Sequence, residues 1–210
     1  MTEPRISTMS SGRSKVATRT RGQQRRAEII EAATAILLEK GHSGLVLRDV
    51  AARVGIRIGN LHYYFQNKQE LLIAIFSHQS SAYVQGVKDA VSLVKGRESG
   101  LLAIFDAGLS VIKRPEAKLW KILIARAQYD PEARALFLQE NQIYHQITVE
   151  ALLNIDSSIS ETRALAIAHF VWTLLDGISL QIGLISETSE EFISVEEEAR
   201  QTVKNLLRAD

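Results

Sequence analysis

The sequence predicts an all-α fold of about nine helices: an N-terminal three-helix domain with a helix-turn-helix, and a larger C-terminal helical domain. Apolar residues recur at steps of three and four along most of the chain, the period of an amphipathic helix, and no segment shows the convincing alternation of a strand. The 210 residues are 46% hydrophobic, which supplies the core of one large or two modest domains.

The N-terminal elements follow from local signals. Residues 1–22 mix Ser, Thr, Gly and Arg without periodicity, so they are expected to form a disordered basic arm. An apolar stripe predicts a helix over 25–40, which Gly41 ends. The segment LVLRDVAARVGIRIGNLHYYFQNK, residues 45–68, contains a short apolar-faced helix, a turn at Gly55 and a second short helix. This order is that of a helix-turn-helix.

Capping residues and prolines divide the remainder. Asn67 is expected to cap a long helix from Lys68 to about residue 95, and Ser99 one that ends near residue 112. Pro115 and Pro131 suit first helical positions, which predicts helices at about 115–129 and 131–154. The last two helices, within 161–185 and at about 195–207, follow the capping boxes Ser158-x-x-Glu161 and Ser194-x-x-Glu197.

Composition argues against several functions. The chain has no cysteine, so it has no disulfide, no cysteine-ligated zinc and no thiol nucleophile, which suits a cytoplasmic location. It shows no Ser/His/Asp set, no paired carboxylates and no phosphate loop, so we expect no enzyme and no cofactor. His145 and His169 have no second ligand at metal-binding spacing in the sequence, so no metal site is expected either.

Residues 164–185 are apolar enough to resemble a membrane span. Asp176 near the middle would cost about 2.5–3.5 kcal/mol on membrane insertion, and the acidic flanks offer no cationic anchor. The better prediction is a helix buried on several sides, within one subunit and at a dimer interface, with no membrane partner. Asp176 and Gly177 are expected to make a buried polar contact and a close helix crossing, with a polar effector contact as the alternative.

Charge is unevenly distributed. Residues 1–26 carry seven Lys or Arg against one Glu, a net charge of +6, while the whole chain carries +1 and the remainder therefore −5. The N-terminal end is thus the part that suits an anionic partner.

The helix over 25–40, the stretch RDVAARVGI and the run GNLHYYFQNKQELL together resemble the N-terminal domain of TetR-family (tetracycline repressor) transcriptional regulators over roughly 50 residues. Three positions depart from the family pattern: Val46 replaces a threonine N-cap, Arg57 a serine, and Ile58 a residue that is commonly polar. The missing caps should each cost about 1 kcal/mol of helix stability, and Arg57 and Ile58 bear on which bases are read.

The resemblance implies three segments: the arm 1–22, a DNA-binding domain 23–70, and an effector-binding and dimerisation domain 71–210. It places the second helix of the motif in the major groove of double-stranded DNA, where Arg57 suits guanine and Asn60 adenine. Ile58 touches a thymine methyl or shields the turn, and Tyr63 and Lys68 bind phosphates. The predicted DNA-binding residues are Arg25, Arg26, Arg48, Arg57, Ile58, Asn60, His62, Tyr63 and Lys68.

For the C-terminal part the resemblance implies a homodimer and a pocket for a small, mostly apolar effector. The candidate wall residues are aromatic, although aromatics at helical spacing also suit an ordinary core: Phe105, Trp120, Phe137, Tyr144 and Trp172. The function implied is a ligand-responsive regulator, a repressor released from a palindromic operator. The alternative is an effector-free architectural or protein-interaction factor of the same fold.

Overall fold

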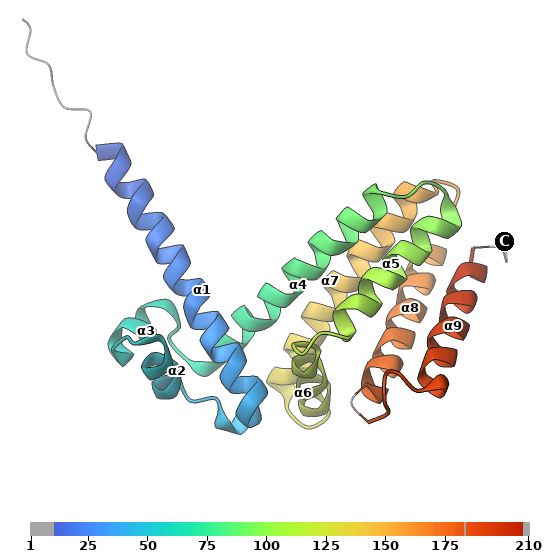
Figure 1. Ribbon diagram of the computed structural model, residues 1–210. Coiled ribbons are helices and arrows are strands. Elements are labelled where there is room, and N and C mark those ends of the chain that lie inside the picture. Colours follow the sequence, from blue (N-terminus) through green and yellow to red (C-terminus); the bar gives the residue numbers. More distant parts are fainter. Residues whose placement is uncertain (1–10, 183, 208–210) are drawn as a thin grey trace, which may run out of the picture. The chain divides into compact units, whose positions relative to one another are not determined.

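The computed structural model describes residues 11–182 and 184–207, and over those residues the regular elements are nine α-helices with no strand (Figure 1). The helical fold class predicted from the sequence is therefore confirmed. The chain divides into two compact units, one ending at Ile75 and the other beginning at Phe76. The division falls inside one helix, α4, five residues beyond the predicted domain boundary.

The first helix, α1, spans Ser11–Gly44. It begins within the segment 1–22 for which the sequence predicted an unstructured arm; residues 1–10 lie outside the described part. Arg, Lys, Gln and Ala, which are good helix formers, are frequent between residues 13 and 27 and favour this extension. The predicted stop at Gly41 appears as a kink, because Gly41 takes φ 68° and ψ −176° inside the helix.

Two short helices complete the motif: α2 (Leu47–Val54) and α3 (Ile58–Tyr64). Neither N-cap residue, Val46 or Arg57, makes a capping side-chain hydrogen bond, as the sequence predicted. Gly55 closes α2 at φ 74° and ψ 32°, and its N–H donates to the carbonyls of Ala51 and Ala52. The core of this unit is formed by one apolar stripe from each helix and is made mainly of Ile29, Ile30, Ala33, Ile36, Leu37, Leu45, Val50, Ala51, Leu61, Phe65, Leu71 and Leu72.

Helix α4 (Lys68–Ser92) belongs to both units, and Asn67 caps it as predicted, since its Oδ1 accepts from Glu70 N at 2.8 Å. The second unit adds α5 (Arg97–Ile112), α6 (Ala117–Ala127), α7 (Pro131–Ile155), α8 (Glu161–Gln181) and α9 (Glu190–Asn205). Helix α7 packs against α6 and α8, and α5 packs against α7, α8 and α9. Asp130 caps α7 by accepting from Glu132 N and Ala133 N.

Several predicted helix starts were wrong by a few residues. Ser160, not Ser158, caps α8 by accepting from Arg163 N, and Ser189, not Ser194, caps α9 by accepting from Phe192 N. Both capping serines have extended backbone angles, which an N-cap requires, and the sequence offers more than one serine near each start. Helix α5 begins at Arg97, before Ser99, and α6 at Ala117, two residues after Pro115.

Helix α8 is long and apolar enough to span a membrane by length and composition. In the structure one side of it packs in the core of the second unit, through Ala164, Ile167, Val171, Leu175 and Ile178. The buried polar contact predicted for Asp176 is present, because Trp120 Nε1 donates to its Oδ1 at 2.9 Å. The close crossing at Gly177 is not found within this chain, since no described atom lies within 4 Å of the place its Cβ would take.

Candidate functional site

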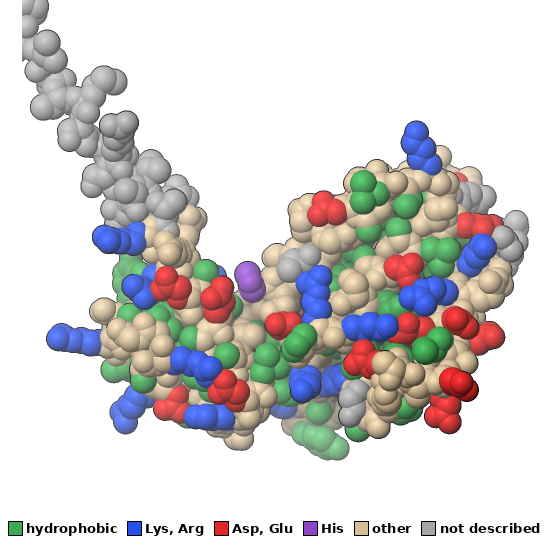
Figure 2. Space-filling view, viewed as in Figure 1, with side chains coloured by type: hydrophobic (Ala, Val, Ile, Leu, Met, Phe, Trp, Pro, Cys, Tyr) green, Lys and Arg blue, Asp and Glu red, His purple; other side chains and the backbone are tan. Residues whose placement is uncertain are grey.

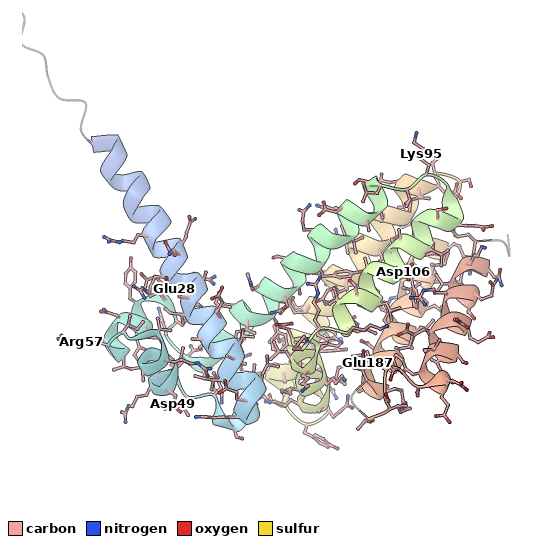
Figure 3. The ribbon with its side chains drawn as sticks, viewed as in Figure 1. Glu28, Asp49, Arg57, Lys95, Asp106 and Glu187 are labelled. Atoms are coloured by element: carbon pink, nitrogen blue, oxygen red, sulfur yellow. The ribbon has the colours of Figure 1, made fainter. Side chains whose placement is uncertain are left out.

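Helix α3 presents a polar and aromatic face that the core does not use. Leu61 and Phe65 are buried and anchor the helix, whereas Tyr63 is 84% exposed. Arg57, Ile58, Asn60 and His62 are exposed as well; Arg57 extends away from the first unit (Figure 3). Buried anchors and an exposed contact face on one short helix are what a DNA-reading helix requires.

Four of the predicted DNA-binding residues surround one shallow hollow between α2, α3 and the start of α4: Arg48, Ile58, His62 and Lys68. Lys68 is half-buried, and its Nζ donates to the carbonyl oxygen of His42. Lys68 therefore also ties the start of α4 to the end of α1. Sequence reasoning missed Ser43 and Leu47, which line the same hollow.

Arg25 and Arg26 lie on α1. The Arg25 guanidinium pairs with Glu28 at 2.7 Å, and the Arg26 guanidinium lies 5.0 Å from the ring centroid of Phe65, at the end of α3. The contact with Phe65 keeps Arg26 next to the motif. Lys and Arg side chains protrude from several parts of this unit, among a smaller number of acidic ones (Figure 2).

The second unit contains an aromatic cluster formed by α4, α6, α7 and α8. The ring centroid of Tyr144 lies 4.8 Å from that of Trp172, 5.5 Å from that of Trp120 and 5.0 Å from that of Tyr83. All four rings line a cavity with a volume of about 60 Å³. That volume has room for several waters, but it is smaller than the roughly 300–1,000 Å³ of pockets that bind drug-sized ligands.

The predicted wall residues separate into three groups. Trp120, Tyr144 and Trp172 line the cavity. Phe137 packs behind Trp120 with ring centroids 5.1 Å apart, and Phe105 is fully buried in the core. Tyr83, which reaches the cavity from α4, was not predicted from the sequence.

Two acidic side chains accompany the aromatics. Asp176 lines the cavity, and burial raises the pKa of its carboxyl, although the hydrogen bond from Trp120 opposes the rise. Glu140 on α7 is fully buried and accepts hydrogen bonds from Ser80 and, at 3.1 Å, from Ser77, both on α4. The signal for Glu140 was present in the sequence, because it interrupts the apolar stripe of α7 between Leu136 and Tyr144. Burial raises the pKa of Tyr144 to about 12, and both carboxylates add to the rise.

The two histidines predicted to be isolated are in fact neighbours. The rings of His145 on α7 and His169 on α8 have centroids 3.9 Å apart. Burial, with His169 adding to it, lowers the pKa of His145 to about 4, so its imidazole is neutral at physiological pH. Within residues 11–182 and 184–207, no set of three or more His, Cys, Asp or Glu side chains forms a group that could hold a metal ion.

The second unit exposes large apolar side chains on its last two helices. Leu165, Phe170 and Leu180 on α8 are 43–48% exposed, and Ile193 and Val195 on α9 are 46% and 49% exposed. The apolar residues of α9 are divided between two environments, since Ala199 and Val203 are buried inside the unit while Val195 is exposed. Ile178 on α8 is 3% exposed and belongs to the core, so it is not available to an interface; α8 packs against α5 and α7.

Comparison with known proteins agrees with this geometry. Residues 29–75 match the family model described as bacterial regulatory proteins, tetR family. The chain is 24% identical over 162 residues to the HTH-type transcriptional regulator BetI of Brucella anthropi, covering 76% of this chain and 82% of that protein.

Two solved structures share the fold. A putative transcriptional regulator from Pseudomonas aeruginosa PAO1 superposes with a TM-score of 0.72 at 19% identity, covering 89% of this chain and 90% of the other. The multidrug binding protein EbrR, complexed with imidazole, superposes with a TM-score of 0.63 at 23% identity, covering 87% and 94%.

Proposed function

We propose that this chain, a member of the TetR family of transcriptional regulators, binds a palindromic DNA operator as a homodimer and leaves it when a small, mostly apolar molecule enters the aromatic cavity. The observation that carries the DNA-binding part is the face of α3: Leu61 and Phe65 are buried, and Tyr63 remains 84% exposed. A helix whose aromatic and amide side chains stay exposed while its apolar anchors are buried suits the major groove.

The residues of this face divide by chemistry. Arg57 offers a bidentate donor pair for guanine, and Asn60 offers a donor and an acceptor for adenine, so these two would specify sequence. Tyr63 and Lys68 would contact phosphates, which fixes position but carries little sequence information. Arg25 and Arg26 would add electrostatic attraction from α1.

The dimer would use the outer faces of α8 and α9. The exposed large apolar side chains there are Leu165, Phe170 and Leu180 on α8 and Ile193 and Val195 on α9. The same two helices of a second copy, related by a two-fold axis, would cover exposed apolar side chains of both copies in a four-helix bundle. A two-fold dimer would present two reading helices to successive major grooves, about 34–36 Å apart.

The effector response would pass through α4. Its second half contributes Tyr83 to the cavity, and Ser77 and Ser80 donate to Glu140 on the cavity-lining helix α7. Its first residues belong to the DNA-binding unit. A ligand that displaces Trp120 or Tyr144 would therefore disturb the α4–α7 contacts and, through the continuous helix, the spacing of the reading helices. Ligand and operator would then weaken each other's binding by the same factor.

One observation favours a second candidate, a DNA-bound factor without an effector. The aromatic rings fill most of their own cluster and leave only about 60 Å³ for a ligand. In this case the C-terminal unit would serve dimerisation or contact with another protein. A screen for compounds that release operator DNA separates the two candidates.

The experiment begins with selection of duplexes from a random DNA pool by the full chain, followed by binding titrations. We expect an enriched, imperfectly palindromic site. Asn60→Ala should relax the preference at particular bases by about 1–3 kcal/mol each. Tyr63→Phe should weaken binding to all DNA sequences alike, because it removes one phosphate contact. Arg53→Ala is the matched control, since Arg53 lies on α2 and its guanidinium pairs with Glu39. A pool without an enriched site would contradict the proposal.

A further inference from the structure

The side chains around the aromatic cavity carry excess negative charge. Its lining includes one cationic residue, Arg114, and two anionic ones, Glu116 and Asp176. Among the ion pairs of the described residues, none includes Asp176. Glu140, a third carboxylate, does not line the cavity but is joined to it through Ser80, whose Oγ donates to Glu140 and hydrogen-bonds with the hydroxyl of Tyr144. The half-buried carboxylate of Asp176 therefore lies in an acidic part of the cavity wall, without an ion-pair partner among the described residues.

This arrangement is costly for the protein without a ligand. A carboxylate removed from water is destabilised unless a cation or several hydrogen bonds replace its hydration. Among the described side chains, only Trp120 donates a hydrogen bond to Asp176, through its Nε1, and burial raises the pKa of the Asp176 carboxyl. Ser179, one turn further along α8, is 2% exposed, lines the same cavity, and its Oγ has no hydrogen-bond partner. These polar groups are poorly satisfied by the protein's own side chains.

The aromatic rings supply the complementary surface. Trp120, Tyr144 and Trp172 line the space next to Asp176, and Tyr83 packs against both Tyr144 and Trp172. The face of an aromatic ring is negatively polarised, so ring faces attract a cation, and the attraction grows when the cation is desolvated. The free volume of about 60 Å³ suits a compact head group, and the exposed Arg114 marks where the cavity reaches the surface.

We propose that the ligand of this cavity is an organic cation, an amine or quaternary ammonium group on an apolar body, with its charged head between Asp176 and the faces of Trp120 and Trp172. The proposal rests on the proposed function, because it names the ligand class of the same site. The aromatic surface still gives the ligand a mostly apolar environment, and the acidic end selects its charge.

The test uses the full chain and two probes of the same shape. Benzyltrimethylammonium carries a quaternary nitrogen where neopentylbenzene has a carbon, so only the charge differs. Trp120 and Trp172 are the two tryptophans of the chain, and quenching of their fluorescence reports occupancy. The cation should bind at least about tenfold more tightly than the neutral probe, the order expected for a desolvated cation over aromatic rings. Equal or weaker binding of the cation would overturn the proposal.

A variant pair assigns the effect to Asp176. Asp176→Asn keeps an oxygen acceptor for Trp120 and removes the charge. The affinity of this variant for the cation should be about tenfold lower than that of the wild type, and its affinity for the neutral probe should change less than threefold. Asp89→Asn is the control, because Asp89 is exposed on α4, and it should leave both affinities unchanged. An unchanged cation affinity in folded Asp176→Asn protein would overturn the role of Asp176, and the wild-type comparison stands even if that variant does not fold.

Operator release separates this proposal from the proposed function. Release by the cation but not by the neutral probe supports both. If the neutral probe releases DNA and the cation does not, the effector response stands and the cationic ligand is wrong. If neither probe binds, and a broad screen also finds no releasing compound, the effector-free candidate replaces both.

Discussion

The contact between α4 and α7 depends on Ser80, and replacing it with alanine tests how firmly the two helices are joined. Ser80 is 2% exposed; its Oγ donates to a carboxylate oxygen of Glu140 and hydrogen-bonds with Tyr144 Oη at 3.1 Å. A hydrogen bond to a charged group contributes about 1.5–3 kcal/mol and a neutral one about 0.5–1.5 kcal/mol. Ser80→Ala should therefore destabilise the second unit by about 3 kcal/mol, a fall in melting temperature of about 6–12 °C.

Urea unfolding followed by tryptophan fluorescence measures this loss, because both tryptophans belong to the second unit. Ser81→Ala is the matched control: Ser81 is exposed, and its Oγ bonds only the carbonyl of Ser77 within the same helix. The control should stay within about 0.5 kcal/mol of wild type. In a double-mutant cycle with Glu140→Gln, the two losses should be non-additive by more than about 0.5 kcal/mol. A loss for Ser80→Ala no larger than for Ser81→Ala would refute the reasoning.

Three further predictions concern the dimer, the histidine pair and the turn of the motif. Leu180→Glu places a charge on the exposed face of α8 (48% exposed) and should give folded monomers in light scattering, whereas Ile178→Glu (3% exposed) should unfold the second unit; a Leu180→Glu protein still dimeric at micromolar concentration would place the interface elsewhere. The pKa of His145 is lowered from 6.5 to about 4, by burial first and then by His169, so its contribution to stability is complete above pH 6.5 and is lost as the pH falls toward 4. Because the ring is half exposed, we expect on the order of 1 kcal/mol between pH 7 and 5, seen as a difference in urea unfolding between wild type and His145→Gln; identical pH profiles would contradict it. Gly55→Ala should cost about 1–2 kcal/mol in thermal unfolding, since Gly55 holds a left-handed conformation with no steric neighbour, and Gly55→Asn should cost less; an unchanged midpoint for the alanine variant would show that the turn adjusts.

The sequence by itself determined the features that depend on neighbouring residues. The helical period, the caps at Asn67 and Asp130 and the left-handed stop at Gly55 involve groups within about four positions of each other, and the structure has all of them. The reading face of α3 was predictable for the same reason, because Leu61 and Phe65 are the only strong apolar anchors of that helix. Even local signals were ambiguous where several serines competed, as at the starts of α8 and α9.

Tertiary structure decided what depends on the order in which helices pack. Helix α8 is apolar on most of its surface, so its sequence alone does not show that Ile178 faces the core while Leu180 faces outward. His145 and His169 come from different helices and become neighbours only because α7 packs against α8. Ser80 and Glu140 are 60 positions apart, and the acidic aromatic cavity exists only once five helices, α4 to α8, have packed around it. Side-chain period fixes which residues share a helix face, but only the packing of whole helices fixes which faces meet.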